Sequence, residues 1–105
     1  LYLDGLTSIT DEQAKSLSKV EILVLSRLPT ITDEQVKILS EVKTLNLSGL
    51  TSITDQQAES LSKVFWLELR GVESITEPQA ENLSKVKYLY IPISCLELIN
   101  QYKTP

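Results

Sequence analysis

Apolar and polar residues follow a pattern that returns every 22 positions along the chain. Each copy opens with leucine, any residue, leucine, as at Leu23 and Leu25, and continues with apolar positions three apart, as at Val36 and Leu39. Period-two alternation predicts a short strand with one apolar face, and the wider spacing predicts the buried stripe of a helix. The chain is therefore expected to repeat one short strand and one short helix.

The repeats are regular enough to predict an architecture. They span residues 1–22, 23–44, 45–66 and 67–88, and the first and third agree at 16 of 22 positions. Self-similarity with a period of about 20–50 residues is typical of stacked repeat proteins. One 22-residue coil cannot bury its own apolar face. We therefore expect a single α/β domain over residues 1–105, with parallel strands along one side of the stacked coils and helices along the other.

The predicted helices share a start signal. A threonine is followed three residues later by a glutamine, beginning at Thr10, Thr32, Thr54 and Thr76. This spacing is typical of a capping box, in which the two side chains satisfy backbone N–H groups at the helix start. Acidic residues after the threonines suit the positive end of the helix. Single glycines follow three of the predicted strands, where we expect turns with positive φ at Gly5, Gly49 and Gly71.

The two ends depart from the repeat. The sequence starts inside a coil, so we expect an N-terminal cap or further repeats to precede Leu1. Residues 89–105 contain a last strand, then Pro92, then Ser94 and Glu97 at the spacing of another capping box. We expect a capping helix over residues 94–102, in which Cys95 packs as a small apolar residue.

The repeated wording L-x-L-x-x-L-x-x-I-T-D resembles a known family. It is similar to the cysteine-containing subtype of leucine-rich repeats found in F-box proteins, and to bacterial repeat arrays of similar wording, over residues 1–91. The resemblance implies a right-handed leucine-rich-repeat solenoid with strands on a concave face and helices on a convex face. By resemblance to the bacterial arrays, it also suggests a place outside the cell or on its surface.

Composition narrows the possible functions. The net charge is −4, which argues against nucleic acid and against a polybasic membrane surface as partners. No apolar run approaches the length of about 18 residues that membrane insertion needs. The chain has no histidine and one cysteine, so we find no nucleophile–base pair and no zinc ligand set. We expect a protein that is not an enzyme and needs no cofactor or metal.

Residues predicted on the concave face differ from coil to coil. One column runs through Ile22, Thr44, Trp66 and Tyr88, a second through Tyr2, Val24, Asn46, Glu68 and Tyr90, and a third through Asp4, Ser26, Ser48, Arg70 and Pro92. The polar helix positions are uniform: glutamine at 13, 35, 57 and 79, and serine at 18, 40, 62 and 84. We expect both sets to face solvent, so this contrast favours a function on the concave face.

Aromatic residues are concentrated on the predicted concave face. Five of the six aromatic residues fall on or beside the predicted concave face, close to Arg70 and Glu68. Aromatic residues and arginine are enriched in the energetic centres of protein interfaces. The predicted partner-binding residues are Tyr2, Val24, Asn46, Phe65, Trp66, Glu68, Arg70, Tyr88 and Tyr90.

A protein partner is the favoured interpretation, and three others stay open. Aromatic rings also stack on sugars, which would make this a glycan-binding surface. The array could instead be a structural spacer in a larger bacterial surface protein. Bulky residues also suit strands in general, which would leave the aromatic residues without a binding role.

Overall fold

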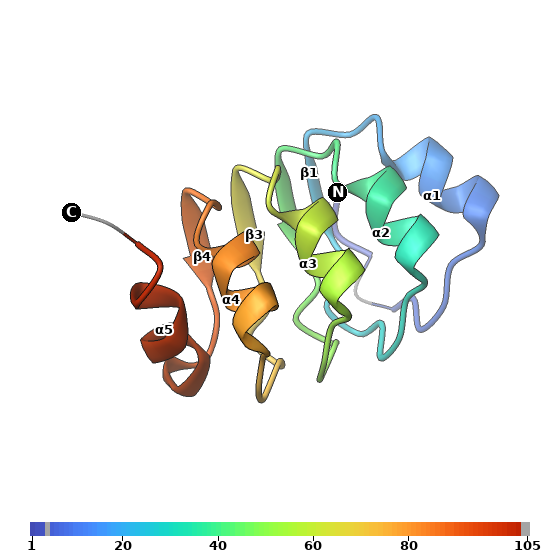
Figure 1. The fold of residues 1–105 in the computed structure, drawn as a ribbon. Helices are drawn as coiled ribbons and strands as arrows, with labels where there is room; N and C mark the ends of the chain where they lie inside the picture. Colours follow the sequence, from blue (N-terminus) through green and yellow to red (C-terminus); the bar gives the residue numbers. More distant parts are fainter. Residues whose placement is uncertain (4, 104–105) are drawn as a thin grey trace.

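In the computed structural model, strands and helices alternate along the chain as the repeat predicts (Figure 1). The structure describes residues 1–3 and 5–103. Asp4, predicted in the third column, and residues 104–105, predicted in the capping segment, lie outside the described residues. The elements are α1 (Asp11–Leu17), β1 (Ile22–Val24), α2 (Asp33–Leu39), β2 (Thr44–Asn46), α3 (Asp55–Leu61), β3 (Trp66–Glu68), α4 (Glu77–Leu83), β4 (Tyr88–Tyr90) and α5 (Ile93–Asn100).

The strands form one parallel sheet in sequence order, β1-β2-β3-β4. Partner residues are 22 positions apart in every pair, as in Leu23 with Leu45 and Leu45 with Leu67. The length of the sequence repeat therefore equals the separation in sequence between paired strand residues. Residues 1–3 were predicted as a further strand before β1. Among the described residues they form only an isolated bridge between Tyr2 and Val24.

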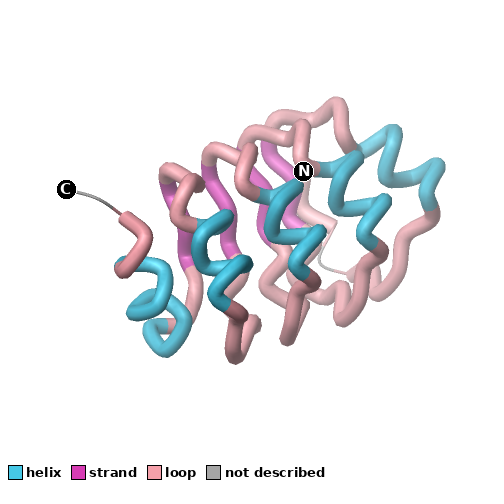
Figure 2. The backbone as a smooth tube through the Cα atoms, viewed as in Figure 1, coloured by secondary structure: helices cyan, strands magenta, loops and turns pink. Residues whose placement is uncertain are grey.

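Helices and strands occupy separate layers, as Figure 2 shows. The leucines of each strand point between the layers, and Leu23, Leu45 and Leu67 are fully buried there. The helices contribute the other half of the core, as the buried Val36 and Leu39 of α2 illustrate. The molecule is elongated, 38 × 21 × 20 Å, because each coil adds one strand and one helix to the stack.

The predicted capping boxes are confirmed in all four repeats. In each, the threonine side chain accepts from the backbone N–H of the glutamine, and the glutamine side chain accepts from the backbone N–H of the threonine. The capping box predicted at Ser94 is wrong. Helix α5 begins at Ile93 after Pro92, without a side-chain cap, so Ser94 lies inside its first turn.

Three of the four uniform glutamines, Gln35, Gln57 and Gln79, are buried, although all four were predicted to face solvent; Gln13 is exposed as predicted. The amide nitrogen Nε2 of Gln57 donates to the carbonyl oxygen of Ile31 in the preceding coil at 2.9 Å, and Gln79 does the same to Ile53. Gln35 donates to Ile9 at 3.1 Å. These side chains are 4–7% exposed. We call these three bonds the glutamine ladder. It explains the uniformity of this position without any reference to binding.

The uniform serines also have a structural role. Each ends a helix, and its hydroxyl donates to the carbonyl oxygen three residues earlier, as from Ser40 to Lys37 at 2.7 Å. Either lysine or glutamate occupies the acceptor positions, Lys15, Lys37, Glu59 and Glu81, because only their backbone carbonyls take part in the serine bond. The contrast between a variable sheet face and a uniform helix face was therefore not evidence of function.

Glycine is required at these positions for a different reason from the one predicted. No described glycine has positive φ. Gly49 instead lies against the preceding coil, where an added Cβ would stand 2.7 Å from the carbonyl oxygens of Ser26 and Leu28. Gly71 is confined in the same way by Ser48 and Leu50, whereas a Cβ on Gly5 would meet nothing within 4 Å. Close approach of neighbouring coils, not turn conformation, requires glycine at Gly49 and Gly71.

Helix α5 packs beside α4 at the C-terminal end of the stack. Ile99 and Cys95 are buried there, and the Cys95 thiol lies 3.6 Å from the carbonyl oxygen of Val72. Burial raises the pKa of the Cys95 thiol, and a hydrogen bond with Ser94 partly offsets this. The prediction that Cys95 packs as a small apolar residue is confirmed.

Candidate interaction surface

The sheet has one face turned away from the helices, which we call the outer sheet face. It carries the first and third residues of each strand, because successive side chains of a strand point to opposite sides. In β2, Leu45 is fully buried between the layers while Thr44 and Asn46 are partly exposed. The same alternation places Trp66, Glu68, Tyr88 and Tyr90 on the outer sheet face.

Four of the predicted residues form one contiguous group, which we call the aromatic cluster: Phe65, Trp66, Tyr88 and Tyr90. The Trp66 ring lies 5.3 Å from both tyrosine rings, stacked on Tyr90 and tilted against Tyr88. Phe65 meets Tyr88 edge-to-face at 5.2 Å. These are preferred geometries for aromatic pairs. The register that pairs Trp66 with Tyr88 brings the rings together, as the column pattern predicted.

The cluster remains accessible despite these contacts. Phe65 is 40% exposed, Tyr88 41% and Tyr90 37%. Large apolar side chains that stay this open and lie side by side form a surface patch rather than a core.

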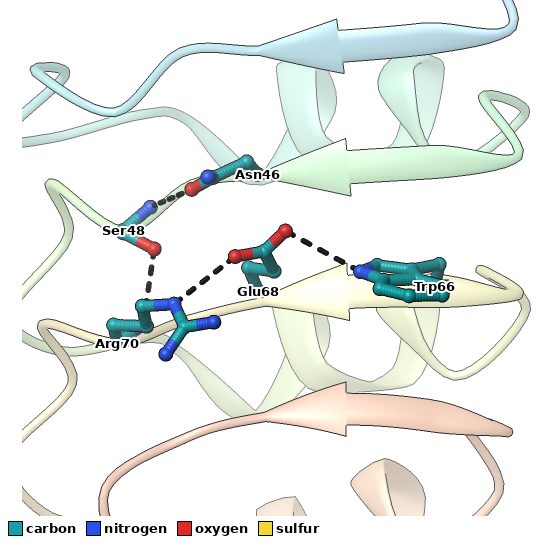
Figure 3. Close-up of polar contacts among 5 residues, drawn as sticks. All are labelled: Asn46, Ser48, Trp66, Glu68 and Arg70. Atoms are coloured by element: carbon teal, nitrogen blue, oxygen red, sulfur yellow. Dashed lines mark hydrogen bonds and ion pairs between the residues drawn. The ribbon is translucent and has the colours of Figure 1, made fainter.

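A polar network holds Trp66 and Arg70 along strand β3 (Figure 3). One carboxylate oxygen of Glu68 accepts from the indole nitrogen of Trp66 at 3.3 Å, and the other accepts from Nε of Arg70 at 3.0 Å. The backbone N–H of Arg70 in turn donates to the Ser48 hydroxyl at 3.2 Å. Glu68 thereby orients both neighbours, and its own charge is paired.

Cations lie over three of the four rings. The Arg70 guanidinium is 5.1 Å from the centre of the Tyr90 ring, and Nζ of Lys43 is 5.4 Å from that of Phe65. Nζ of Lys87 is 5.9 Å from the centre of the Tyr88 ring. All three distances lie within the range of about 6 Å in which a cation is attracted to a ring face.

The structure separates the remaining predicted residues from the cluster. Val24 was predicted to be available to a partner but is only 9% exposed, because its short side chain lies between Tyr2 and Asn46 in the sheet. The amide oxygen of Asn46 accepts from the backbone N–H of Ser48 at 2.9 Å and shapes the turn after β2. Tyr2 is 73% exposed, but its strand position is separated from that of Glu68 by those of Val24 and Asn46.

Two members of the surface were missing from the predicted site. Lys43 and Lys87 precede strands β2 and β4, in the same row as Phe65. The signal was present in the column Glu21, Lys43, Phe65, Lys87, where two lysines flank an aromatic residue. In a sequence, a lysine next to a strand is usually interpreted as a solvated charge. The contacts of Lys43 and Lys87 with aromatic rings are seen only in the structure.

A depression adjoins the aromatic cluster at its C-terminal side. It is lined by Arg70, Leu89, Tyr90, Ile91, Pro92 and Leu96. Apart from Arg70, this lining is mostly apolar, and it lies between β4 and the start of α5.

Other kinds of site find no support in the described part of the chain. Within residues 1–3 and 5–103, no group of three or more histidine, cysteine, aspartate or glutamate side chains is placed to hold a metal ion. Among the described helices, none combines the length and apolar character needed to cross a membrane.

Known proteins were compared with the chain in three ways. The searches covered protein-family models, curated proteins and solved structures. None of them finds a match.

Proposed function

We propose that the chain is a right-handed leucine-rich-repeat solenoid that works as a protein-binding module through its outer sheet face. The repeat architecture is supported by the equality of the 22-residue sequence period and the sheet register. The glutamine ladder and the glycines add contacts between coils that recur with the same period. The 22-residue wording favours the leucine-rich-repeat family, and the outer sheet face corresponds to its concave face.

The aromatic cluster is the observation that carries the proposal. Its rings are ordered by mutual contacts and by Glu68, yet Phe65, Tyr88 and Tyr90 remain exposed and Trp66 is half-buried. A rigid, exposed aromatic group loses little conformational entropy on binding and can desolvate a large apolar area.

The sheet itself does not require aromatic residues. Strands β1 and β2 carry Ile22, Val24, Thr44 and Asn46 on the same face, and they pair in the same register as β3 and β4. Strand propensity therefore does not account for the concentration of rings on β3 and β4. Binding, rather than support of the strand, gives that concentration a reason.

A glycan is less well supported as the partner. Sugars bind aromatic side chains by lying flat on a ring face. Tyr90 is flanked by Trp66 on one side and by Arg70 on the other, since these occupy diagonal positions on either side of its strand partner Glu68. A ring enclosed in this way offers an edge and a hydroxyl rather than a free face.

The proposal is tested by capture from lysate and extracellular material of source cells with three versions of the chain. These are the unaltered protein, the double variant Trp66→Ala/Tyr88→Ala, and the matched variant Tyr2→Ala, which removes an exposed aromatic residue outside the cluster. Loss of a central aromatic residue costs about 2 kcal/mol or more in a protein interface, so the double variant should lose the partner.

Circular dichroism melting curves establish that the variants remain folded. A protein retained by the unaltered chain and by Tyr2→Ala, but not by the double variant, supports the proposal. Equal retention by all three, or retention by none, contradicts it and favours a spacer without a binding face.

A further inference from the structure

We propose that the partner presents an acidic polypeptide segment with at least one apolar side chain to the aromatic cluster. This inference rests on the proposed function, because it specifies the chemistry of the partner at the same surface. It follows from the charges around the rings, from the ring edges and hydroxyls left open, and from the depression beside Tyr90.

The first argument is the local charge. The aromatic cluster is bordered by three cations, Lys43, Lys87 and Arg70, and by one carboxylate, Glu68, so these four groups carry a net charge of +2. The whole chain carries −4, so everything outside this surface carries −6. In the row of residues that precede the strands, Lys43 lies between Phe65 and the next carboxylate, Glu21. A positive patch on a negative molecule favours a negative partner at this place.

The second argument is how the rings present themselves. Aromatic faces are negative and aromatic edges positive. Here Lys43, Arg70 and Lys87 lie over the faces of Phe65, Tyr90 and Tyr88. Trp66 stacks on Tyr90 as well, so ring edges, tyrosine hydroxyls and the N–H groups of the cations are prominent among the groups offered to a partner. These are complementary to carboxylates, and they are poorly suited to the flat bases of a nucleic acid, which stack on open ring faces.

The third argument concerns the apolar part of the partner. The depression beside the cluster is lined by Leu89, Ile91, Pro92 and Leu96, with Arg70 and Tyr90 at the same site. A side chain such as leucine or phenylalanine can enter it while a neighbouring carboxylate meets Arg70. Apolar and acidic groups one or two residues apart occur in polypeptides, whereas sulfated glycans and nucleic acids supply anions without aliphatic side chains.

The experiment is selection from a displayed library of random 12-residue peptides without tryptophan, against the whole immobilised chain. Trp66 is the only tryptophan in the chain, so its fluorescence reports binding at the cluster directly. We expect the recovered peptides to be more acidic than the starting library, to contain leucine or phenylalanine, and to change the Trp66 emission. Their affinity should fall when salt is raised from about 50 to 300 mM, since exposed charges are then screened.

Two charge variants make the test specific. Lys43→Gln/Lys87→Gln removes two cations from the cluster, and Lys15→Gln/Lys37→Gln removes two from helices α1 and α2. The two variants have the same net charge. We expect the first to weaken the selected peptides about tenfold and the second less than about twofold, because short-range charge complementarity acts locally. The single variant Lys43→Glu repeats the test if the double variant melts at a lower temperature.

The outcomes separate this inference from the proposed function. Peptides that bind at Trp66 but are neutral or basic overturn the acidic partner and leave a protein-binding face. Recovery of no peptide overturns both. Heparin or an oligo-dT strand that changes the Trp66 emission at lower concentration than the best peptide overturns the polypeptide and identifies a different polyanion.

Discussion

Glutamine in the third helical position shows how one residue type can occupy two environments in a repeat. Gln57 bonds to its own helix start and to the preceding coil, whereas Gln13 makes only the bonds of the capping box and is exposed. The capping box was predictable because both of its members lie within four residues of each other. The ladder bond was not, because it joins residues 26 positions apart and depends on how coils stack.

Substitution of Gln57 by alanine should therefore destabilise the protein more than the same substitution of Gln13. Both variants lose the capping-box bond, but only Gln57→Ala leaves the carbonyl oxygen of Ile31 without its partner. Because this bond is part-buried, leaving its acceptor unpaired should cost about 1 kcal/mol, the lower end of the range for buried groups. Urea denaturation gives the two free energies of unfolding, and equal losses would show that the ladder bond contributes nothing.

The aromatic residues were placed in the correct columns from sequence because the repeat length equals the sheet register. Val24 was misjudged because alternation gives the face of a residue but not how much its neighbours cover it. Lys43 and Lys87 were missed for a related reason, since a long flexible side chain can reach a ring or point to solvent from the same backbone position.

At the scale of elements, local signals predicted the strands and the first four helices well. Each helix α1 to α4 has seven residues and begins after its threonine. The start of α5 was predicted one residue late. Pro92, with φ −56°, already occupies the N-cap position, so the helix begins at Ile93 and Ser94 is too far into the first turn to cap it. Proline's fixed φ outweighed the serine–glutamate spacing.

A contact between Tyr102, which follows α5, and Glu77 of α4 should make the stability of the protein depend on pH. The Tyr102 hydroxyl donates to a carboxylate oxygen of Glu77 at 3.1 Å. Burial, this hydrogen bond and the negative charges of Glu77 and Glu81 raise the pKa of Tyr102 above its usual value of 10.0. The stability from the protonated phenol is therefore complete below about pH 10 and is lost as pH rises through the raised pKa.

Tyr102→Phe removes this contribution at all pH values. The difference in the free energy of unfolding between the unaltered chain and the variant should therefore be larger at pH 8 than at pH 11. Chemical denaturation at both values measures it, with the other three tyrosines present in both proteins as an internal control. A difference that grows between pH 8 and pH 11 would mean that the contact favours the ionised phenol.

At the scale of the whole molecule, the coils are alike in sequence but not in burial. Leu61 and Val64 of the third coil are buried, while their first-coil equivalents Leu17 and Val20 are only half-buried. Helix α1 packs mainly against one helix, α2, whereas α3 packs against both α2 and α4. Local stability in a stacked array depends on such neighbour contacts.

Amide hydrogen exchange should reveal this gradient. We expect the backbone N–H groups of α1 to exchange about tenfold or more faster than those of α3, since fewer buried contacts oppose local opening. Mass spectrometry of exchanged peptides, or NMR, resolves the two helices. Uniform protection across α1 and α3 would indicate that the whole array opens in one step.

The glutamine ladder has a consequence for how such a molecule can change in length. Each of these three junctions offers the same matching parts, an amide donor on one coil and a carbonyl acceptor on the preceding coil. A unit of 22 residues can therefore be duplicated or deleted within the stack, and the new neighbours meet with the bonds they already use. An insertion that changes the spacing of 26 residues between an acceptor and its donor disturbs the bond unless a loop absorbs the added residues. The sheet face takes no part in this matching, so the array can be extended unit by unit while each added strand is free to acquire its own surface chemistry.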